Sequence, residues 1–313
     1  MSDKNLYKKL CGEDNDIPVF MHPWWLDVVC HDWDVVIARK GEHITGVWAY
    51  PLETKMGITF RRTPQLTPYL GPHIFYPADL KESNHDSFQH EVVAELMKKL
   101  PEAKVWHLAI QPNIKQVGLF KQHGLRAQVQ QTFLLELNDN EETLLANMKD
   151  TTRRNVRLAE KEVEISQSTE YLKDLYKFQK HTLAKKGTKM PYTLSDFKTI
   201  MDAGIANDAC ALWVAKSGKK VQAIVWQVWD NKRSYYFMGG QNPETNSYRA
   251  MSLLLWHTIK EAKKRGQTIF DLEGSMDEGV ERFYRNFGGD RALYIILHKN
   301  DSIVWRLKQM ILR

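Results

Sequence analysis

Hydrophobic and polar positions follow one pattern twice along this chain. The segments VVIARKGEHITGVWAYPL (35–52) and LWVAKSGKKVQAIVWQVW (212–229) each contain an apolar run, a charged turn with Gly41 or Gly218, and a second apolar run. Two such runs joined by a short turn that contains glycine are typical of a β-hairpin. We therefore predict one hairpin near the middle of each half of the chain.

The segments that follow the two hairpins also correspond. A further strand is predicted at 57–62 and at 234–240, and a helix at 87–100 and at 249–266. The second helix ends on three cationic residues and Gly266, which favour a helix C-terminus. Both halves therefore continue with the same two elements in the same order.

Each half then closes with a strand, a short helix that ends in glycine, and a last strand. The predicted segments are 104–110, 118–124 and 131–137 in the first half, and 268–274, 281–289 and 292–298 in the second. Repetition of one set of elements along a chain indicates a duplicated architecture. Strands mixed with helices and hairpins predict a mixed α/β sheet in each copy.

The residues between the two copies predict helices. A basic helix is expected at 141–161, a strand begins near Val163, and two helices follow near 170–186 and 193–206. Thr193 or Ser195 is a plausible N-cap for the last of these helices. We predict an N-terminal domain at 1–138 and a C-terminal domain at 139–313, which the basic helix opens.

Composition sets wide limits on function. The 313 residues are 43% hydrophobic and 26% charged, with a formal net charge of +6. This mild basicity permits an anionic partner without requiring one. No apolar run has the length of a membrane span, and the N-terminus lacks the apolar core of a signal peptide. The three cysteines and the histidines form no metal-binding motif. We expect a cytoplasmic protein without a metal.

Three stretches resemble the Fem/GNAT group of acyltransferases. They are TTRRNVRLAEKEVEI (151–165), SLLLWHTIKEAKKRGQTIFDLEGS (252–275) and FYRNFGG (283–289). This group includes the FemABX-like peptidyltransferases of cell-wall synthesis and related acetyltransferase-like proteins. The resemblance implies two tandem GNAT-like domains. It also implies an N-acyltransferase that moves an acyl or aminoacyl group from an activated donor to an amine.

The chain departs from the family pattern at two places. Tyr284 occupies the position of the lysine in the FKxxFG pattern, which the resemblance associates with an aminoacyl-tRNA donor. The glycine-rich pyrophosphate loop of GNAT enzymes is replaced by SYRAM (247–251). The first departure favours acyl-CoA over aminoacyl-tRNA slightly, and both donors remain open.

Tyr284 is the candidate general acid. It lies four residues before Gly288, as in the Y-x-x-x-G pattern of GNAT enzymes, whose phenol can protonate the departing thiolate. A phenol with a pKa near ~10 stays protonated at neutral pH and can still give its proton to a strong base. The matching residue of the first half, Phe120, has no such proton, so we expect only the second half to be catalytic. The alternative is that Tyr284 is a packing residue.

Asp271 and Glu273 are the candidate general bases. They alternate along a predicted strand and are therefore expected on one side of it. The carboxyl ends of strands line ligand clefts in open α/β sheets, and a carboxylate there can take a proton from an attacking amine. The alternatives are hydrogen bonding to backbone for Asp271 and simple solvation for Glu273.

Two further groups are candidate anion sites. The N-terminus of helix 249–266 offers unpaired N–H groups to the donor phosphates, and Gly240, Arg249, Ala250 and Met251 are its candidate residues. Arg153, Arg154 and Arg157 form the densest basic cluster and are candidates for binding a substrate phosphate. The alternative for this cluster is a solvated helix face.

The acceptor is open between a small amine, a cell-wall precursor and a protein lysine, and tRNA is a possible partner. Tyr69 and His73 are the first-half aromatic residues most suited to contact a substrate. The tail SIVWRLKQMILR (302–313) is amphipathic and basic, which permits weak contact with a membrane surface, although packing on the body is favoured. The second function class is a non-catalytic module that binds an anionic polymer or a phosphorylated ligand.

Overall fold

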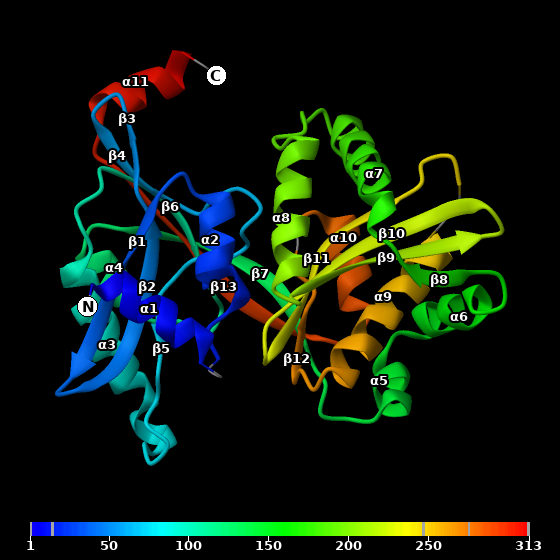
Figure 1. The fold of residues 1–313 in the computed structure, drawn as a ribbon, viewed down its shortest axis with the longest axis horizontal. Helices are drawn as coiled ribbons and strands as arrows, with labels where there is room; N and C mark the ends of the chain where they lie inside the picture. Colours follow the sequence, from blue (N-terminus) through cyan, green and yellow to red (C-terminus); the bar gives the residue numbers. More distant parts are fainter. Residues whose placement is uncertain (1, 14–15, 246–247, 275, 312–313) are drawn as a thin grey trace. The chain divides into compact units, whose positions relative to one another are not determined.

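The fold consists of two compact units built from α-helices and mixed β-sheets (Figure 1). A computed structural model describes residues 2–13, 16–245, 248–274 and 276–311. Unit 1 comprises Met1–Gln130 together with Leu293–Arg313, and unit 2 comprises Gln131–Ala292. The mixed α/β fold class expected from the sequence is confirmed.

Unit 1 contains the first predicted hairpin. Strands β1 and β2 pair antiparallel from Trp33↔Pro51 to Lys40↔His43, and β5 adds to β2. A second group of strands pairs in the order β3-β4-β6-β13. The strands are β1 (Trp33–Lys40), β2 (His43–Pro51), β3 (Glu53–Lys55), β4 (Ile58–Arg62), β5 (His73–Ile74), β6 (Val105–Ile110) and β13 (Asp290–Asn300).

The helices of unit 1 include two that the hydrophobic pattern did not predict, α1 and α2. Their bounds are α1 (Asp3–Gly12), α2 (Pro23–Val29), α3 (His85–Lys99), α4 (Val117–Gln122) and α11 (Ile303–Ile311), with single 3-10 turns at Val19–Met21 and Glu82–Asn84. One apolar core joins β1, β2 and β6 to α3, with Trp48 and Leu96 fully buried in it. The tail forms helix α11 over Ile303–Ile311, and the last two residues of the tail, Leu312 and Arg313, lie outside the described part of the chain.

Unit 2 is a sheet covered by helices on both faces. Its strands follow the order β7-β12-β11-β10-β9-β8. Val225 of β10 packs in the core formed with α9, whereas the next residue, Trp226, packs against Phe197 of α8. Because neighbouring strand residues point to opposite faces, α9 and α8 cover opposite faces of the sheet.

The elements of unit 2 agree closely with the predicted series. They are β7 (Arg126–Glu136), α5 (Glu141–Asn147), α6 (Asp150–Ala159), β8 (Glu164–Gln167), α7 (Leu172–Lys185), α8 (Leu194–Ala206), β9 (Cys210–Ser217), β10 (Lys220–Trp229), β11 (Arg233–Gln241), α9 (Tyr248–Lys264), β12 (Ile269–Asp271) and α10 (Glu278–Arg285), with a 3-10 turn at Thr169–Tyr171. Thr193 caps α8 in a capping box with Asp196, which confirms the predicted helix start.

The last strands of the two repeats are exchanged between the units. The prediction closes each domain on its own last strand, with a boundary after Asn138. Instead, β7 pairs with β12 in unit 2 and β13 pairs with β6 in unit 1. The first unit therefore ends at Gln130 and takes back residues 293–313. Hydrophobic periodicity identifies a strand but does not identify the strand that it pairs with.

The predicted basic helix at 141–161 is two helices, and this part of the prediction is wrong. Helix α5 ends at Asn147 and α6 begins at Asp150. Met148 between them has extended backbone and is buried in the core, and the Lys149 N–H donates to the Asn286 carbonyl. Burial of Met148 and this hydrogen bond hold the two residues in a conformation that a continuous helix does not allow.

Candidate active site

A cavity of about 950 Å³ opens within unit 2, and the candidate acid and one candidate base line it. Its wall is built from the end of α7, strand β11, the β11–α9 loop, the start of α9, the turn after β12, and α10. Tyr284 and Glu273 both belong to this wall. Two of the three groups proposed from the sequence for proton transfer therefore share one cavity.

Helix α10 positions Tyr284. The Asp277 side chain caps this helix by accepting the Val280 N–H at 3.1 Å. The apolar face of the helix packs on the unit 2 core, which leaves Tyr284 half-buried with its ring 5.6 Å from the Tyr236 ring in an edge-to-face arrangement. Burial raises the pKa of the Tyr284 phenol well above its usual value, and Tyr236 and Glu273 raise it further. The phenol is therefore protonated at neutral pH.

Gly288 has a steric role in the segment that carries Tyr284. Its φ is +86°, and a Cβ there would lie 2.8 Å from the Asn147 carbonyl oxygen. A side chain would therefore meet both an unfavourable backbone conformation and a fixed backbone atom. This explains why a glycine lies four residues after the tyrosine.

A buried hydrogen-bond network fixes the turn that carries Glu273. The Asp271 Oδ1 accepts the Thr132 hydroxyl at 2.5 Å and the Glu273 N–H at 2.9 Å. The Gly274 N–H donates to the Thr132 Oγ1 at 3.0 Å. A Cβ on Gly274 would lie 2.0 Å from the Gln131 carbonyl oxygen, so only glycine allows this close packing of the turn on β7.

Glu273 itself has a left-handed backbone, with φ +49°. A non-glycine residue in this region carries strain, and such strain concentrates at functional sites. The sequence predicts Asp271 and Glu273 on one side of a strand, but β12 ends at Asp271 and the alternation stops there. Asp271 is fully buried and absent from the cavity wall, whereas Glu273 lines the cavity. Asp271 therefore holds the turn rather than facing a substrate.

The Glu273 carboxyl lies in an environment that favours its protonated form. Its Oε1 is buried and has no hydrogen-bond partner among the described residues, and the same is true of the Asp271 Oδ2. Burial and the negative charge of Asp271 raise the pKa of Glu273 well above its usual value. Burial also raises the pKa of Asp271, while Arg233 and the hydrogen bonds oppose this. Carboxyl pairs of this kind are characteristic of proton-transfer sites.

The other residues proposed for the donor differ in their positions. Met251 lines the cavity, Ala250 is buried in α9, and Arg249 is exposed in the first turn of α9. Gly239 lines the cavity, whereas the predicted Gly240 does not. Gly240 packs closely on α7, since a Cβ there would lie 2.9 Å from Phe178. The N-terminus of α9 therefore borders the cavity, and Arg249 places a positive charge in the first turn of that helix.

The remaining candidates lie elsewhere. The Arg153 guanidinium donates to the Ala146 and Met148 carbonyls and pairs with Asp150, so it stabilises the α5–α6 junction. Arg154 and Arg157 lie on α6, outside the cavity wall. In unit 1, Tyr69 and His73 are buried, and Tyr69 packs edge-to-face on Tyr294.

Several residues of the cavity wall were not predicted as site residues. They include Lys185 and Lys186 at the end of α7, Tyr236 on β11, and Tyr248 at the start of α9. Lys186 pairs with Asp277 at 2.7 Å, which joins α7 to the cap of α10. The basic run that contains Lys185 and Lys186 was a visible signal in the sequence, but nothing in the sequence indicated that α7 ends beside α10.

Comparisons with known proteins identify the type of fold. Residues 145–284 match the sequence model of the acetyltransferase (GNAT) domain family, and this range includes α7, β11, α9, β12 and most of α10. The crystal structure of FemX matches 100% of this chain and 99% of its own, with a TM-score of 0.71 at 13% identity. The chain therefore has a Fem/GNAT-like fold.

Two other solved structures share the fold less closely. One is the C-terminal domain of a putative lysylphosphatidylglycerol synthetase from Agrobacterium fabrum, with a TM-score of 0.50 and 14% identity over 89% of this chain and 87% of that one. The other is a conserved protein of unknown function from Bacteroides thetaiotaomicron VPI-5482, with a TM-score of 0.51 and 9% identity over 95% of this chain and 96% of that one. No curated protein matches the chain in sequence.

The described part of the chain contains neither a membrane-spanning helix nor a cluster of metal ligands. No helix there combines the length and the apolar character needed to cross a bilayer. The described residues also contain no group of three or more histidine, cysteine, aspartate or glutamate side chains arranged to hold a metal ion.

Proposed function

We propose that this protein is an N-acyltransferase and that its reaction takes place in the cavity of unit 2. The observation that carries the proposal is that Glu273 and Tyr284 line the same cavity, one as a carboxyl with a raised pKa and the other as a protonated phenol. The family match over residues 145–284 and the FemX-like fold support an acyl-transfer reaction for this pair.

In the proposed reaction an amine attacks the carbonyl carbon of the activated donor. The new C–N bond forms, and the ammonium proton passes to the Glu273 carboxylate. When the donor is a thioester, the C–S bond breaks and the sulfur leaves with the bonding electron pair and takes the phenolic proton of Tyr284. The proton held by Glu273 then returns to the Tyr284 phenolate through water. The products are an amide and a thiol, and both side chains regain their starting states.

The pKa directions suit these roles. A raised pKa makes the Glu273 carboxylate a stronger base than an exposed glutamate, so it can accept a proton near neutral pH. The raised pKa of Tyr284 keeps the phenol protonated until the leaving group develops charge.

We infer that the donor is acyl-CoA and that its phosphates lie at the N-terminus of α9. The cavity extends to Thr245 and Tyr248, where α9 begins, and Lys185 lines the same wall. Free N–H groups at a helix start bind phosphate, and Lys185 and the exposed Arg249 would add positive charge. The proposed acceptor is the amine of a small molecule or of a cell-wall precursor.

The proposal is tested by measuring product formation with acetyl-CoA and, separately, with aminoacyl-tRNA over a panel of amines. Tyr284→Phe should lower turnover at least about tenfold, because the phenyl ring keeps the packing and loses the proton. Tyr171→Phe is the matched control, since this unit 2 phenol bonds Lys216 outside the cavity wall.

Turnover with acetyl-CoA supports the preferred donor, and turnover with aminoacyl-tRNA alone supports acyl transfer but overturns that donor. Equal turnover of Tyr284→Phe and Tyr171→Phe would contradict the role of the phenol. Absence of turnover with both donors, together with tight and salt-sensitive binding of an anionic polymer, would favour the non-catalytic alternative.

A further inference from the structure

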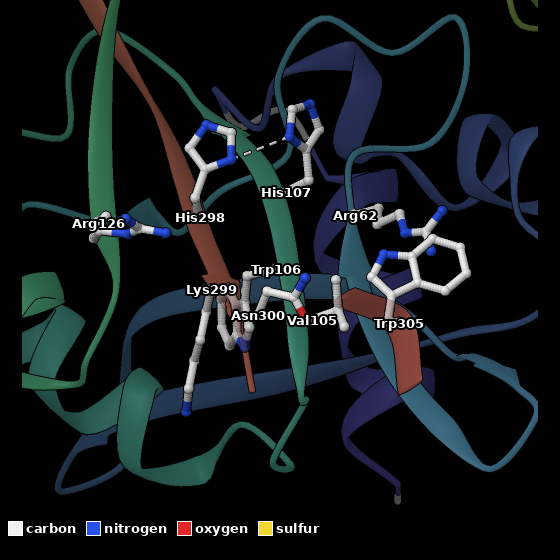
Figure 2. Close-up of a pocket in the computed structure, with 9 residues that line it drawn as sticks. All are labelled: Arg62, Val105, Trp106, His107, Arg126, His298, Lys299, Asn300 and Trp305. Atoms are coloured by element: carbon white, nitrogen blue, oxygen red, sulfur yellow. Dashed lines mark hydrogen bonds between the residues drawn. The ribbon is translucent and has the colours of Figure 1, made fainter. Parts of the chain in front are cut away.

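A second cavity, of about 480 Å³, lies in unit 1 and contains no residue used in the proposed acyl transfer. Figure 2 shows that β6 and β13 form its floor, with Arg126 on one side and Arg62 with Trp305 on the other. These residues come from β4, β6, β7, β13 and α11, so five elements of the fold meet around one space.

Two histidines face each other on the floor. His107 and His298 are opposite one another in the antiparallel β6–β13 pair, so their side chains share a face. Their Nδ1 atoms are 3.3 Å apart, and the Nε2 of His298 is 3.1 Å from the Gln128 Oε1. Burial and Arg62 lower the pKa of His107, while burial, His107 and Arg126 lower that of His298. Burial and the surrounding positive charge therefore disfavour protonation of the pair.

Arg62 brings a hydrogen-bond donor that lacks an acceptor. Its guanidinium lies 3.9 Å from the centre of the Phe60 ring and 5.1 Å from that of Trp305, and its Nη2 is buried without a hydrogen-bond partner in the part of the chain that the structure describes. The Glu53 carboxylate reaches only the Nε, at 3.9 Å. A buried donor without an acceptor is unfavourable, and a ligand acceptor would remove this cost.

No negative charge on the cavity wall balances these groups. None of the nine lining residues is acidic, and Arg126 is exposed and has no ion-pair partner among the described residues. Lys299 pairs with Asp301 at 2.9 Å and, as the neighbour of His298 along β13, projects to the other face of the strand. Lys308 on α11, 5.4 Å from the Trp305 ring, adds charge of the same sign.

We propose that this cavity binds the phosphate group of a small phosphorylated ligand. Arg62 and Arg126 would hold the phosphate oxygens from two sides, and the histidine pair would donate from the floor. The volume exceeds that of one phosphate group and falls within the range of ligand cavities, about 300–1,000 Å³, so the site also has room for an organic part. Trp305 and Val105 provide the apolar surface for that part.

The proposal predicts that anion binding takes up protons. A bound anion between the two arginines offsets their charge and favours protonation of His107 and His298. The affinity should therefore rise as pH falls through the range in which histidine titrates. Sulfate is the suitable first probe because it carries the same charge throughout this range, so any pH dependence belongs to the protein.

The test is calorimetry of the full chain with sulfate and with pyrophosphate, between about pH 8 and about pH 5.5. We expect one site, with affinity rising at least about tenfold on acidification because two imidazoles become charged. Arg62→Gln should weaken binding at least about tenfold. Arg62→Lys should weaken it less, since lysine keeps the positive charge but lacks the paired N–H donors of the guanidinium group. Lys40→Gln, at the exposed end of β1, is the matched control.

His107→Asn tests the floor separately and should reduce the pH dependence while leaving some binding at high pH. Melting curves should show that each variant is folded. Failure of both anions to bind at millimolar concentration would overturn the site, and so would equal binding by Arg62→Gln and Lys40→Gln.

A second arm distinguishes a soluble phosphate ester from a lipid headgroup. Vesicles with anionic lipid are compared with neutral vesicles, using the wild type and Arg62→Gln. Vesicle binding that Arg62→Gln weakens would identify a headgroup as the source of the phosphate. Binding of pyrophosphate without binding of vesicles would identify a soluble ligand. Vesicle binding that Arg62→Gln leaves unchanged, without binding of either free anion, would assign the contact to exposed residues of α11 and refute the cavity.

Discussion

Asp271→Asn offers a test of the proposed base that does not remove the base. The amide oxygen of asparagine can still accept the Thr132 hydroxyl and the Glu273 N–H, so the turn should keep its shape. What changes is the charge beside Glu273. Because that charge raises the pKa of Glu273, its removal should lower this pKa.

The size of the effect follows from Coulomb's law. The Cα atoms of Asp271 and Glu273 lie at most about 7 Å apart, and we take this as the order of the distance between their carboxyl groups. Two unit charges at that distance, with an effective dielectric constant of about 20, repel by about 2.4 kcal/mol, which corresponds to about 1.7 pKa units. The raised pKa of Asp271 means that it is charged for only part of the titration, so we expect a shift of about one unit.

The assay is the pH dependence of kcat/KM, which reports the ionisations of the free enzyme. Glu273 must be ionised to act as a base, so activity should rise with pH through its pKa. In Asp271→Asn this acid limb should move to lower pH, with the maximum rate changed much less. Asp202→Asn removes an exposed negative charge on α8 and should leave the acid limb of the pH profile in place. An acid limb that stays in place or moves to higher pH in Asp271→Asn would refute the assignment of Glu273 as base.

Two further predictions concern stability and its conflict with function. Glu273→Gln should abolish most turnover and yet raise the free energy of unfolding at neutral pH by about 1–3 kcal/mol, because it removes a buried and unpaired charge. Because the folded-state pKa of Glu273 is raised, this residue contributes stability at low pH, and the contribution is lost as pH rises through that pKa. The stability gained by Glu273→Gln should therefore vanish near pH 4 in denaturant titrations. A gain that is constant at all pH values would contradict this reasoning. Gly288→Ala should lower the free energy of unfolding by at least about 1 kcal/mol in the same titrations, owing to its positive φ and the Asn147 carbonyl. Gly218→Ala is the control with positive φ but open space, and an equal loss there would show that crowding has no part.

Hydrophobic periodicity was sufficient to predict most elements and the mixed α/β class. It located the two hairpins, the capped helix after Thr193 and the strand–helix–glycine unit of each repeat. These features are local, because spacing, capping and turn residues all act within a few positions. The proposal that the second half is catalytic also rests on a local difference, tyrosine in one copy and phenylalanine in the other.

The features that the sequence did not predict depend on distant contacts. The exchange of β7 and β13 is a choice of hydrogen-bonding partners that no local pattern contains. The break between α5 and α6 arises from the burial of Met148 and the contact of Lys149 with Asn286. The separation of Asp271 from Glu273 requires the left-handed backbone at Glu273, which is held by Thr132 from another strand. Tertiary contacts override strand alternation at this point.

The two repeats show how one framework carries two kinds of site. Gly124 and Gly288 follow the corresponding helices with φ +75° and +86°, so both helices are followed by a left-handed glycine. In the first copy Phe120 is fully buried against Trp48, whereas Tyr284 lines a cavity in the second copy. His107 takes the position of Asp271 and lines the cationic cavity of unit 1. Corresponding sequence positions therefore carry an acidic network in one unit and a basic cavity in the other. We infer that duplication preserved the scaffold while the charge of its functional surface diverged.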